Sequence, residues 1–450
     1  MKRIVSFLFL IFILSNCSFD NKSGIWKEES KIKKKAEKQD KKKNLKSVFE
    51  VNKIFNEEVN LIPGKKIKID NILKNVAWSD RFFDSTNNIS NVHFSNEKYV
   101  VFKSSKLSKH HIKPNILYYK NNIISYDHRG TIFVYSDLEK KKIFEYNFYK
   151  KKYKKFKKEI NIVINNNNIY ISDNLGYIYS INIESQKLIW AKRIGIPFRS
   201  NIKVVGNKLF LADQDNKLYC FNTLNGKKIW EFASSLTDLK SKFRNNIVVD
   251  TKNNNLFFLN TSGELYSINY LNQAINWFSN LKMKSLKKES RIFLGSPLIL
   301  KNKHLIVSNS SSIFKYDALS GSIIWEKSIS TNLKGVLTKN NLFLYSSNNL
   351  LICLDLNDGQ VLWSKNTNKQ IKNLYGKKLY NKIKIISKIS IVDNKVFLFS
   401  KEGYLLTFDY KNGEIESVNR ILKSGLGNDP IFANGYLYSL DNNNRLFQFR

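Results

Sequence analysis

One fifteen-residue pattern recurs along this chain, and it limits the possible fold more than any other feature. It reads "GYIYSINIESQKLIW" at residues 176–190. If Gly176 is counted as position zero, apolar or aromatic residues stand at +3 and +5, an Asn or Asp usually stands at +6, and Gly is frequent at +10. The pattern occurs seven times, and its +14 residues are Phe144, Trp190, Trp230, Trp277, Trp325, Trp363 and Ser417.

The spacing within the pattern predicts a β-hairpin. Side chains alternate along a strand, so the residues at +3 and +5 lie on one face of the sheet. A short Asn or Asp side chain caps a turn at +6, and Gly at +10 accepts the positive φ that precedes the return strand. The aromatic residue at +14 then returns to the core.

Short apolar runs such as "KLFLADQ" and "NLFLYSS" stand between the copies and predict further strands. A strand-rich repeat of about 40 to 50 residues is typical of a propeller blade of four strands. We expect the +14 aromatic residues to dock each blade against its neighbour, because one blade cannot bury its own faces. A row of Trp that stacks on a ligand is the alternative.

The two ends of the repeat array predict how the ring closes. An eighth copy begins at Asn444 and stops at Arg450, before its return strand, while Trp78 in "NVAWSDRF" has no hairpin before it. We expect the N-terminal strand around Trp78 to pair with the C-terminal strands, because a shared blade removes open sheet edges. The sequence thus predicts an all-β, eight-bladed propeller of four-stranded antiparallel blades over residues 71–450. Its blade-docking residues are Trp78, Trp190, Trp230, Trp277, Trp325 and Trp363.

Residues 1–16 read as a lipoprotein signal peptide. Lys2 and Arg3 precede an apolar run that is too short to span a bilayer as a helix. "LSNC" resembles a bacterial lipobox, which would make Cys17 the acylated first residue of the mature protein. Ser18 after it resembles the default for delivery to the outer membrane. A plain signal peptide with a chance cysteine is the alternative.

A Lys-rich tether and linker is expected over residues 17–70. Residues 27–46 hold many Lys and little to bury, so they predict a disordered spacer, either close to anionic lipid headgroups or simply solvated. Apolar residues return over 48–68 and predict a segment packed on the outside of the domain. Cys220 and Cys353 stand in strand-like runs, and they allow either a disulfide or two buried free thiols.

The formal net charge of +38 invites a nucleic-acid partner. Lys, Asn and Ile are enriched together, however, and Arg, which reads bases and clamps phosphates, is scarce. This pattern favours a solvated Lys surface and no nucleic-acid partner.

The motif "LYSxNxxxGxxxW" resembles the propeller repeat of quinoprotein alcohol dehydrogenases. Together with the lipobox, the ending "GNDPIFANGYLYSLDNNNRLFQFR" and Trp78, the chain resembles the BamB family of lipoproteins over residues 71–450. That resemblance implies a non-catalytic scaffold on the periplasmic face of the outer membrane, anchored through Cys17. Its implied partners are the POTRA domains of BamA and other Bam components, and its implied role is to aid insertion of outer-membrane proteins.

In that family an exposed loop with an Arg flanked by apolar residues contacts BamA. The resemblance places Phe243 and Arg244 at this loop as partner-binding residues; a solvated loop Arg is the alternative. The family's following acidic pair is absent from "SRIFLGSPLIL", where Ile292 and Leu294 stand.

Quinoprotein dehydrogenases with a similar fold hold pyrroloquinoline quinone over calcium, with a vicinal disulfide. This chain has no Cys-Cys pair, no evident cluster of oxygen ligands and no metal-binding spacing of its His residues. We therefore expect no catalytic residues, no metal and no cofactor. A quinoprotein-like enzyme and another periplasmic binding propeller, for polysaccharide or peptidoglycan, are the alternatives.

Overall fold

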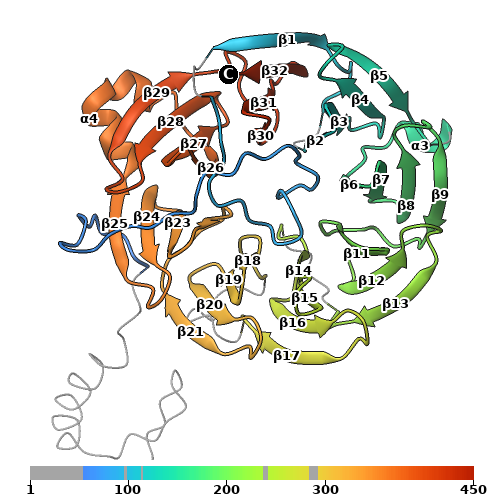
Figure 1. The fold of residues 1–450 in the computed structure, drawn as a ribbon, viewed down its shortest axis with the longest axis horizontal. Coiled ribbons are helices and arrows are strands. Elements are labelled where there is room, and N and C mark those ends of the chain that lie inside the picture. Colours follow the sequence, from blue (N-terminus) through green and yellow to red (C-terminus); the bar gives the residue numbers. More distant parts are fainter. Residues whose placement is uncertain (1–53, 96–98, 113–114, 150, 237–241, 283–291) are drawn as a thin grey trace, which may run out of the picture. The chain divides into compact units, whose positions relative to one another are not determined.

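The structure is a computed structural model that describes residues 54–95, 99–112, 115–149, 151–236, 242–282 and 292–450. Ile54–Arg450 is one compact unit, in which eight four-stranded antiparallel sheets surround a common centre (Figure 1). The predicted eight-bladed propeller is therefore confirmed. The signal peptide, Cys17 and residues 17–53 of the tether lie outside the described residues. In the part that is described, no helix is long and apolar enough to cross a membrane.

Each of the first seven blades is formed by four consecutive strands, from the innermost strand outward (Figure 1). Blades one to four consist of β2 (Leu117–Tyr119), β3 (Asn122–Tyr126), β4 (Ile132–Ser136) and β5 (Lys141–Tyr146); β6 (Ile160–Asn165), β7 (Asn168–Asp173), β8 (Tyr177–Asn182) and β9 (Leu188–Arg193); β10 (Lys203–Val205), β11 (Lys208–Ala212), β12 (Lys217–Asn222) and β13 (Lys228–Ala233); β14 (Asn246–Asp250), β15 (Asn255–Leu259), β16 (Glu264–Asn269) and β17 (Ile275–Asn280).

The remaining blades follow the same order, except that the eighth takes its outermost strand from the N-terminal part of the chain. Blades five to eight consist of β18 (Ile299–Lys301), β19 (His304–Ser308), β20 (Ile313–Asp317) and β21 (Ile323–Lys327); β22 (Val336–Leu337), β23 (Asn341–Tyr345), β24 (Leu350–Asp355) and β25 (Val361–Asn366); β26 (Ile386–Val392), β27 (Lys395–Ser400), β28 (Tyr404–Asp409) and β29 (Ile415–Arg420); β30 (Ile431–Ala433), β31 (Tyr436–Leu440), β32 (Arg445–Phe449) and β1 (Val100–Lys106).

The fifteen-residue pattern forms the third and fourth strands of each of the first seven blades, as the spacing predicts. At +6, the Asn222 side chain accepts a hydrogen bond from the Leu224 amide at 2.8 Å and caps the turn. At +10, Gly226 and Gly321 have φ of 66° and 73°. Gln186 takes φ of 56° at the same position, so the left-handed turn is retained where Gly is absent.

Five Trp residues on outermost strands reach across to the next blade. Each indole N–H donates a hydrogen bond to the backbone carbonyl at +7 of the following copy. Four of these following copies have Gly at +10, and a methyl group added to that Gly would clash with the indole or its neighbours. The pairs are Trp190 with Thr223 at 2.8 Å, Trp230 with Tyr270 at 3.3 Å, Trp277 with Ala318 at 3.0 Å, Trp325 with Leu356 at 2.9 Å and Trp363 with Tyr410 at 3.2 Å.

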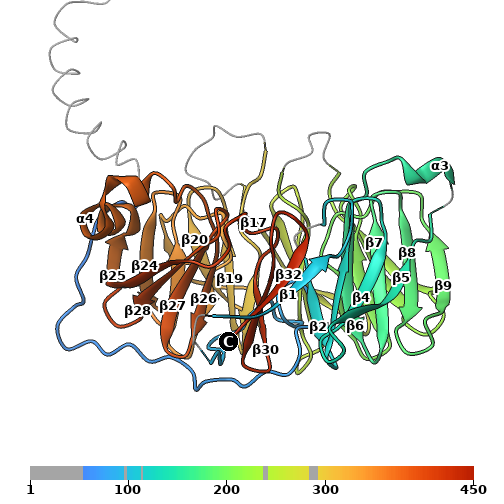
Figure 2. The ribbon, with the colours of Figure 1, turned by 90° about the horizontal axis from the view of Figure 1, so that it is seen from above.

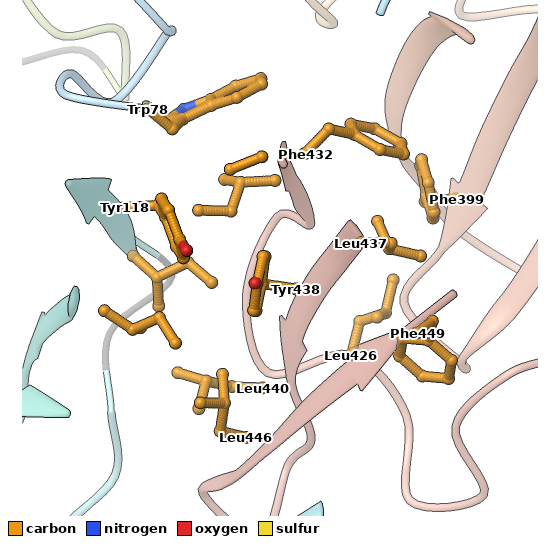
Figure 3. Packing of buried hydrophobic residues seen from close by; sticks show 14 of the residues in the cluster. Trp78, Tyr118, Phe399, Leu426, Phe432, Leu437, Tyr438, Leu440, Leu446 and Phe449 are labelled. Atoms are coloured by element: carbon orange, nitrogen blue, oxygen red, sulfur yellow. The ribbon is translucent and has the colours of Figure 1, made fainter. Parts of the chain in front are cut away.

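The ring is closed by an N-terminal strand, but not by the one around Trp78. β1 pairs with β32 in antiparallel register, with Val100 opposite Phe449. Trp78 instead lies beside blade one, where its backbone exchanges two hydrogen bonds with Tyr118 (Figure 3). The prediction for Trp78 is corrected here: its large buried ring marks a core position, whereas the closing strand is an exposed outer strand without Trp.

Phe102 on β1 occupies the seam that Trp78 was expected to fill. Its ring lies 6.1 Å from that of Tyr135 in blade one, and the Lys140 ammonium, at position +10, lies 4.9 Å from its centroid. On the inner side of this seam, the rings of Tyr118 and Tyr438 are 5.0 Å apart (Figure 3). Aromatic contacts therefore join blades eight and one.

A central segment, defined as residues 71–95, crosses the middle of the ring (Figure 1). Its Asn side chains bond to innermost strands of several blades; the Asn88 side chain, for example, donates to the Leu337 carbonyl at 2.8 Å and accepts from the Leu337 amide at 3.1 Å. Asp80 pairs with the fully buried Lys203 at 2.8 Å. This segment closes much of the channel that the ring would otherwise leave.

Residues 54–62 pack on the outside of the propeller, along β25 and next to the end of β21. Lys68 and Asp70 then contact Asn341 of β23 and Lys301 of β18. Val59 and Ser364 exchange backbone hydrogen bonds of 3.0 and 2.9 Å, and Glu58 pairs with Lys369 at 2.7 Å. Helix α4 (Thr367–Tyr380) follows β25, and the short helix α3 (Lys151–Lys154) follows β5. The described part of the expected linker is thus bound to the ring.

Candidate partner-binding surface

The loops that link successive blades lie on one side of the ring, which we call the upper face. α3 and α4 belong to these links and stand on that side in Figure 2. The segment predicted to bind a partner is one of these links, between β13 and β14. Only its two ends are described, up to Leu236 and from Lys242 onward.

Phe243 is a core residue. Its side chain is only 8% exposed and packs edge-to-face on Phe293, which precedes β18 in the next blade, at 5.2 Å between ring centroids. The expectation of an exposed aromatic side chain at this position is therefore corrected. The Phe243 ring fills the space between the two links and buries apolar surface that the link backbones alone could not bury.

Arg244 remains accessible and lies near the centre of the upper face. It ends the link to β14, and its guanidinium pairs with the carboxylate of Glu159, which stands just before β6 of blade two. The two side chains are 32% and 44% exposed. Arg199, before β10, lies close enough that burial first, and then the charge of Arg244, lower its pKa from the ordinary value.

Exposed apolar side chains stand on the two links that meet at the Phe243–Phe293 contact. Leu236 is 76% exposed, Ile292 39% and Leu294 38%. Ile292 and Leu294 are the chain neighbours of Phe293, as Arg244 is of Phe243. We call Leu236, Arg244, Ile292 and Leu294 the upper-face patch. An accessible Arg among exposed apolar residues is typical of a protein interface.

The two cysteines are separate free thiols. Cys220 lies in β12 of blade three and Cys353 in β24 of blade six, and both are buried. Burial raises the pKa of the Cys220 thiol to about 12, so it stays protonated and unreactive at neutral pH. Of the two states left open by the sequence, buried free thiols are therefore the one observed.

A quinone held over calcium does not fit the described residues. No group of three or more His, Cys, Asp or Glu side chains that could hold a metal occurs within them. Asp317, Asp355 and Asp409 cap turns at +6, where backbone amides occupy their oxygens. Calcium needs six to eight oxygen ligands, and no such set is brought together in the part of the chain that is described.

Sequence reasoning did not identify Glu159, Arg199 or Phe102. Glu159 and Arg199 precede innermost strands of blades two and three, outside the fifteen-residue pattern, so no repeat position marked them. Phe102 stands in "VVFKSSK", where the run of two Val and one Phe, residues with high β-propensity, was the available signal for a strand.

Comparisons with known proteins agree with this architecture. A sequence model of the family described as "Outer membrane protein assembly factor BamB" matches residues 120–365, more than half of the chain. The outer membrane protein assembly factor BamB of Moranella endobia (strain PCIT) is 21% identical over 180 residues, which cover 37% of this chain and 43% of that protein. Quinoprotein glucose dehydrogenase A of Acinetobacter calcoaceticus is 33% identical over 76 residues, 12% of this chain and 10% of that one. The match spans less than half of the length of either relative.

Solved structures share the fold at low identity. BamB from Moraxella catarrhalis has a TM-score of 0.61 at 12% identity, over 78% of this chain and 98% of that one. The quinohemoprotein alcohol dehydrogenase from Comamonas testosteroni has a TM-score of 0.61 at 8% identity, over 83% and 80%. The sequence match over most of the repeats, on a ring of eight blades, shows that the chain belongs to the family of the outer membrane protein assembly factor BamB.

Proposed function

We propose that this chain is a non-catalytic scaffold of the outer-membrane β-barrel assembly complex, which binds the POTRA region of BamA and aids insertion of outer-membrane proteins. The family match over residues 120–365 is the observation that carries the proposal. The rigid ring, the inert thiols and the accessible upper-face patch support a binding role.

The proposed site of contact is the upper-face patch, with Arg244 as its charged anchor. Arg is over-represented among residues that dominate interfaces, and truncation of such a residue often costs about 2 kcal/mol or more. Exposed Leu236, Ile292 and Leu294 supply apolar area around it. Phe243 supports this surface from below and does not contact the partner directly in this proposal.

Cys17 is proposed as the lipid anchor that holds the protein on the periplasmic face of the outer membrane. The tether between Cys17 and Ile54 gives the ring reach from that surface, because an extended chain spans up to about 3.3 Å per residue.

The test is titration of the full chain, in detergent, against purified BamA POTRA domains. We expect Arg244→Glu to weaken binding at least about tenfold, or about 1.4 kcal/mol. Because Arg244 pairs with Glu159, the reversal also places two acids together. The double variant Arg244→Glu with Glu159→Arg restores the pair and should still bind weakly, whereas Arg193→Glu, on the outer strand β9, should bind normally.

If the double variant bound like wild type, the ion pair and not Arg244 as an anchor would explain the loss. If the wild-type chain did not bind POTRA domains at all, the scaffold proposal itself would be rejected.

A quinoprotein-like oxidoreductase is the second candidate, because the fold is shared with solved quinohemoprotein dehydrogenases. Purified protein would then retain a quinone with its own visible absorbance and would reduce an artificial electron acceptor in the presence of an alcohol or sugar. This candidate would be rejected if the same preparation showed neither the quinone absorbance nor turnover after addition of pyrroloquinoline quinone and calcium.

A further inference from the structure

A partly open cavity of about 220 Å³ lies between the central segment and blades five to eight. The central segment contributes Trp78, Arg81 and Phe82 to its wall. Lys334, Lys388 and Asp429 face it from blades six, seven and eight. Three cationic side chains and one carboxylate therefore surround a space the size of roughly seven water molecules, at about 30 Å³ each.

A wider hollow of about 520 Å³ adjoins the cavity between blades six and seven. The two spaces share Asn332, Leu333, Ser387 and Asp429 in their walls. The wider hollow adds Lys384 and Lys401. The positive charge around the cavity thus extends into the wider hollow.

The donors in the cavity exceed the acceptors that the protein supplies. The buried Nε of Arg81 has no hydrogen-bond acceptor. The ammonium of Lys334 has only a long contact of 3.5 Å to the Gly335 carbonyl, and that of Lys388 donates to the Pro430 carbonyl and lies 4.5 Å from the centroid of a Trp78 ring. Among the described residues, Asp429 forms no ion pair within 4.0 Å. Arg81, Lys334 and Lys388 are half-buried and Asp429 is exposed. Half-buried cations with few acceptors favour an anion that supplies acceptors.

The lowered pKa values of two of these lysines limit the cost of partly burying their charges. Burial lowers the pKa of Lys334 to about 7, helped by the charge of Lys388 and of Lys203 and opposed by Asp84 and Asp429. Burial likewise lowers the pKa of Lys388 to about 8, opposed by Asp429. Near pH 8 the two lysines are therefore only partly protonated until an anion stabilises their charged forms.

We infer that this cavity is a binding site for a small organic dianion, with two carboxylates on an apolar or aromatic skeleton. Three cations against Asp429 leave a formal excess of two positive charges, which a dianion neutralises. The guanidinium of Arg81 and the ammonium of Lys334 suit carboxylate oxygens. Phe82 and Leu333 offer apolar surface to the skeleton. An inorganic anion would use the charges and leave this apolar wall without a contact.

The test is isothermal titration of the full chain, in detergent, with isophthalate and with sulfate as separate probes. We expect isophthalate to bind with a Kd below about 1 mM and sulfate to bind at least about tenfold more weakly. Near pH 8 the binding should take up protons, so its apparent enthalpy should differ between Tris and HEPES buffers. Near pH 6 this difference should vanish, because both lysines are already protonated.

Lys334→Met should weaken isophthalate binding at least about tenfold and Arg81→Met should do the same, while the matched Lys339→Met should leave it unchanged. Lys339 lies in the same blade and is exposed in the turn between β22 and β23. Lys334→Met removes a half-buried charge with few acceptors, so it should fold at least as well as wild type, which keeps the test valid. The inference would be overturned if isophthalate did not bind, or if Lys334→Met bound isophthalate as tightly as wild type does. Tighter binding of sulfate than of isophthalate would also overturn it.

Discussion

The rings of Phe243 and Phe293 meet edge-to-face at 5.2 Å with an interplanar angle of 90°. They join the links before blades four and five, and Arg244 and Leu294 are their immediate neighbours along the chain. Phe243 therefore contributes to the upper-face patch by holding the two links together, and not by contact with a partner.

Phe243→Ala should lower the free energy of unfolding by about 3 to 5 kcal/mol, as is usual when a buried Phe is truncated. Arg244→Ala should change it by no more than about 1 kcal/mol, because its ion pair with Glu159 is solvent-accessible. Chemical denaturation of both variants checks this. Equal destabilisation by the two substitutions would contradict the placement of Phe243 in the core.

Gly321→Ala should destabilise the ring more than Gly206→Ala. Both glycines have positive φ, of 73° and 53°, so both substitutions incur left-handed strain of about 1 to 2 kcal/mol. A methyl group on Gly321 would also lie 2.5 Å from the Trp277 ring, whereas Gly206 faces open space. Overpacking of this kind typically adds about 1 to 3 kcal/mol. Melting temperatures of the two variants measure the difference, and equal values would argue against Trp docking at this seam.

Removal of residues 445–450 should open the ring, because β1 would then lose its partner β32. We expect a large fall in the melting temperature and faster proteolysis of β1, since an unpaired outer strand exposes its backbone groups. Phe102→Ala, which keeps the strands, should cost less than the truncation. A truncated chain that melts at the wild-type temperature would refute closure through β32.

Lys334→Met should raise stability at neutral pH. The pKa of Lys334 is lowered from 10.5 to about 7 in the folded protein. Between about pH 7 and pH 10, Lys334 is therefore less protonated in the folded chain than in the unfolded chain. Its contribution to the free energy of unfolding of wild type consequently rises with pH. The advantage of Lys334→Met over wild type should be largest at and below about pH 7 and shrink towards about pH 10. Calorimetric scans across this range, with Lys339→Met as control, test the sign. A constant difference would show that Lys334 keeps an ordinary pKa.

Cys17→Ala should release the protein from the outer-membrane fraction or leave it unprocessed. Acyl chains contribute about 0.8 kcal/mol for each buried methylene, which the screened charges of the tether cannot replace in high salt. Fractionation of cells that express wild type and variant, with a high-salt wash, provides the measurement. A variant that stays membrane-bound after the wash would rule out Cys17 as the anchor.

The sequence by itself determined the repeated hairpin, the blade count and the antiparallel class. These follow from local rules that act within about fifteen residues: alternation along a strand, Asx caps at +6, positive φ at +10 and one aromatic residue at +14. Each copy repeats the same signal, so an imperfect copy such as that ending at Ser417 is still identified by its neighbours.

Only the tertiary structure decided what joins residues far apart in the chain. It showed that β1 and not the strand around Trp78 closes the ring, because an exposed outer strand needs no distinctive apolar pattern. It buried Phe243, paired Arg244 with Glu159 and gathered Arg81, Lys334, Lys388 and Asp429 around one cavity. These residues lie outside the fifteen-residue pattern, in links, in the innermost strand β26 and in the central segment. Their neighbours are set by the closure of the ring and not by local spacing.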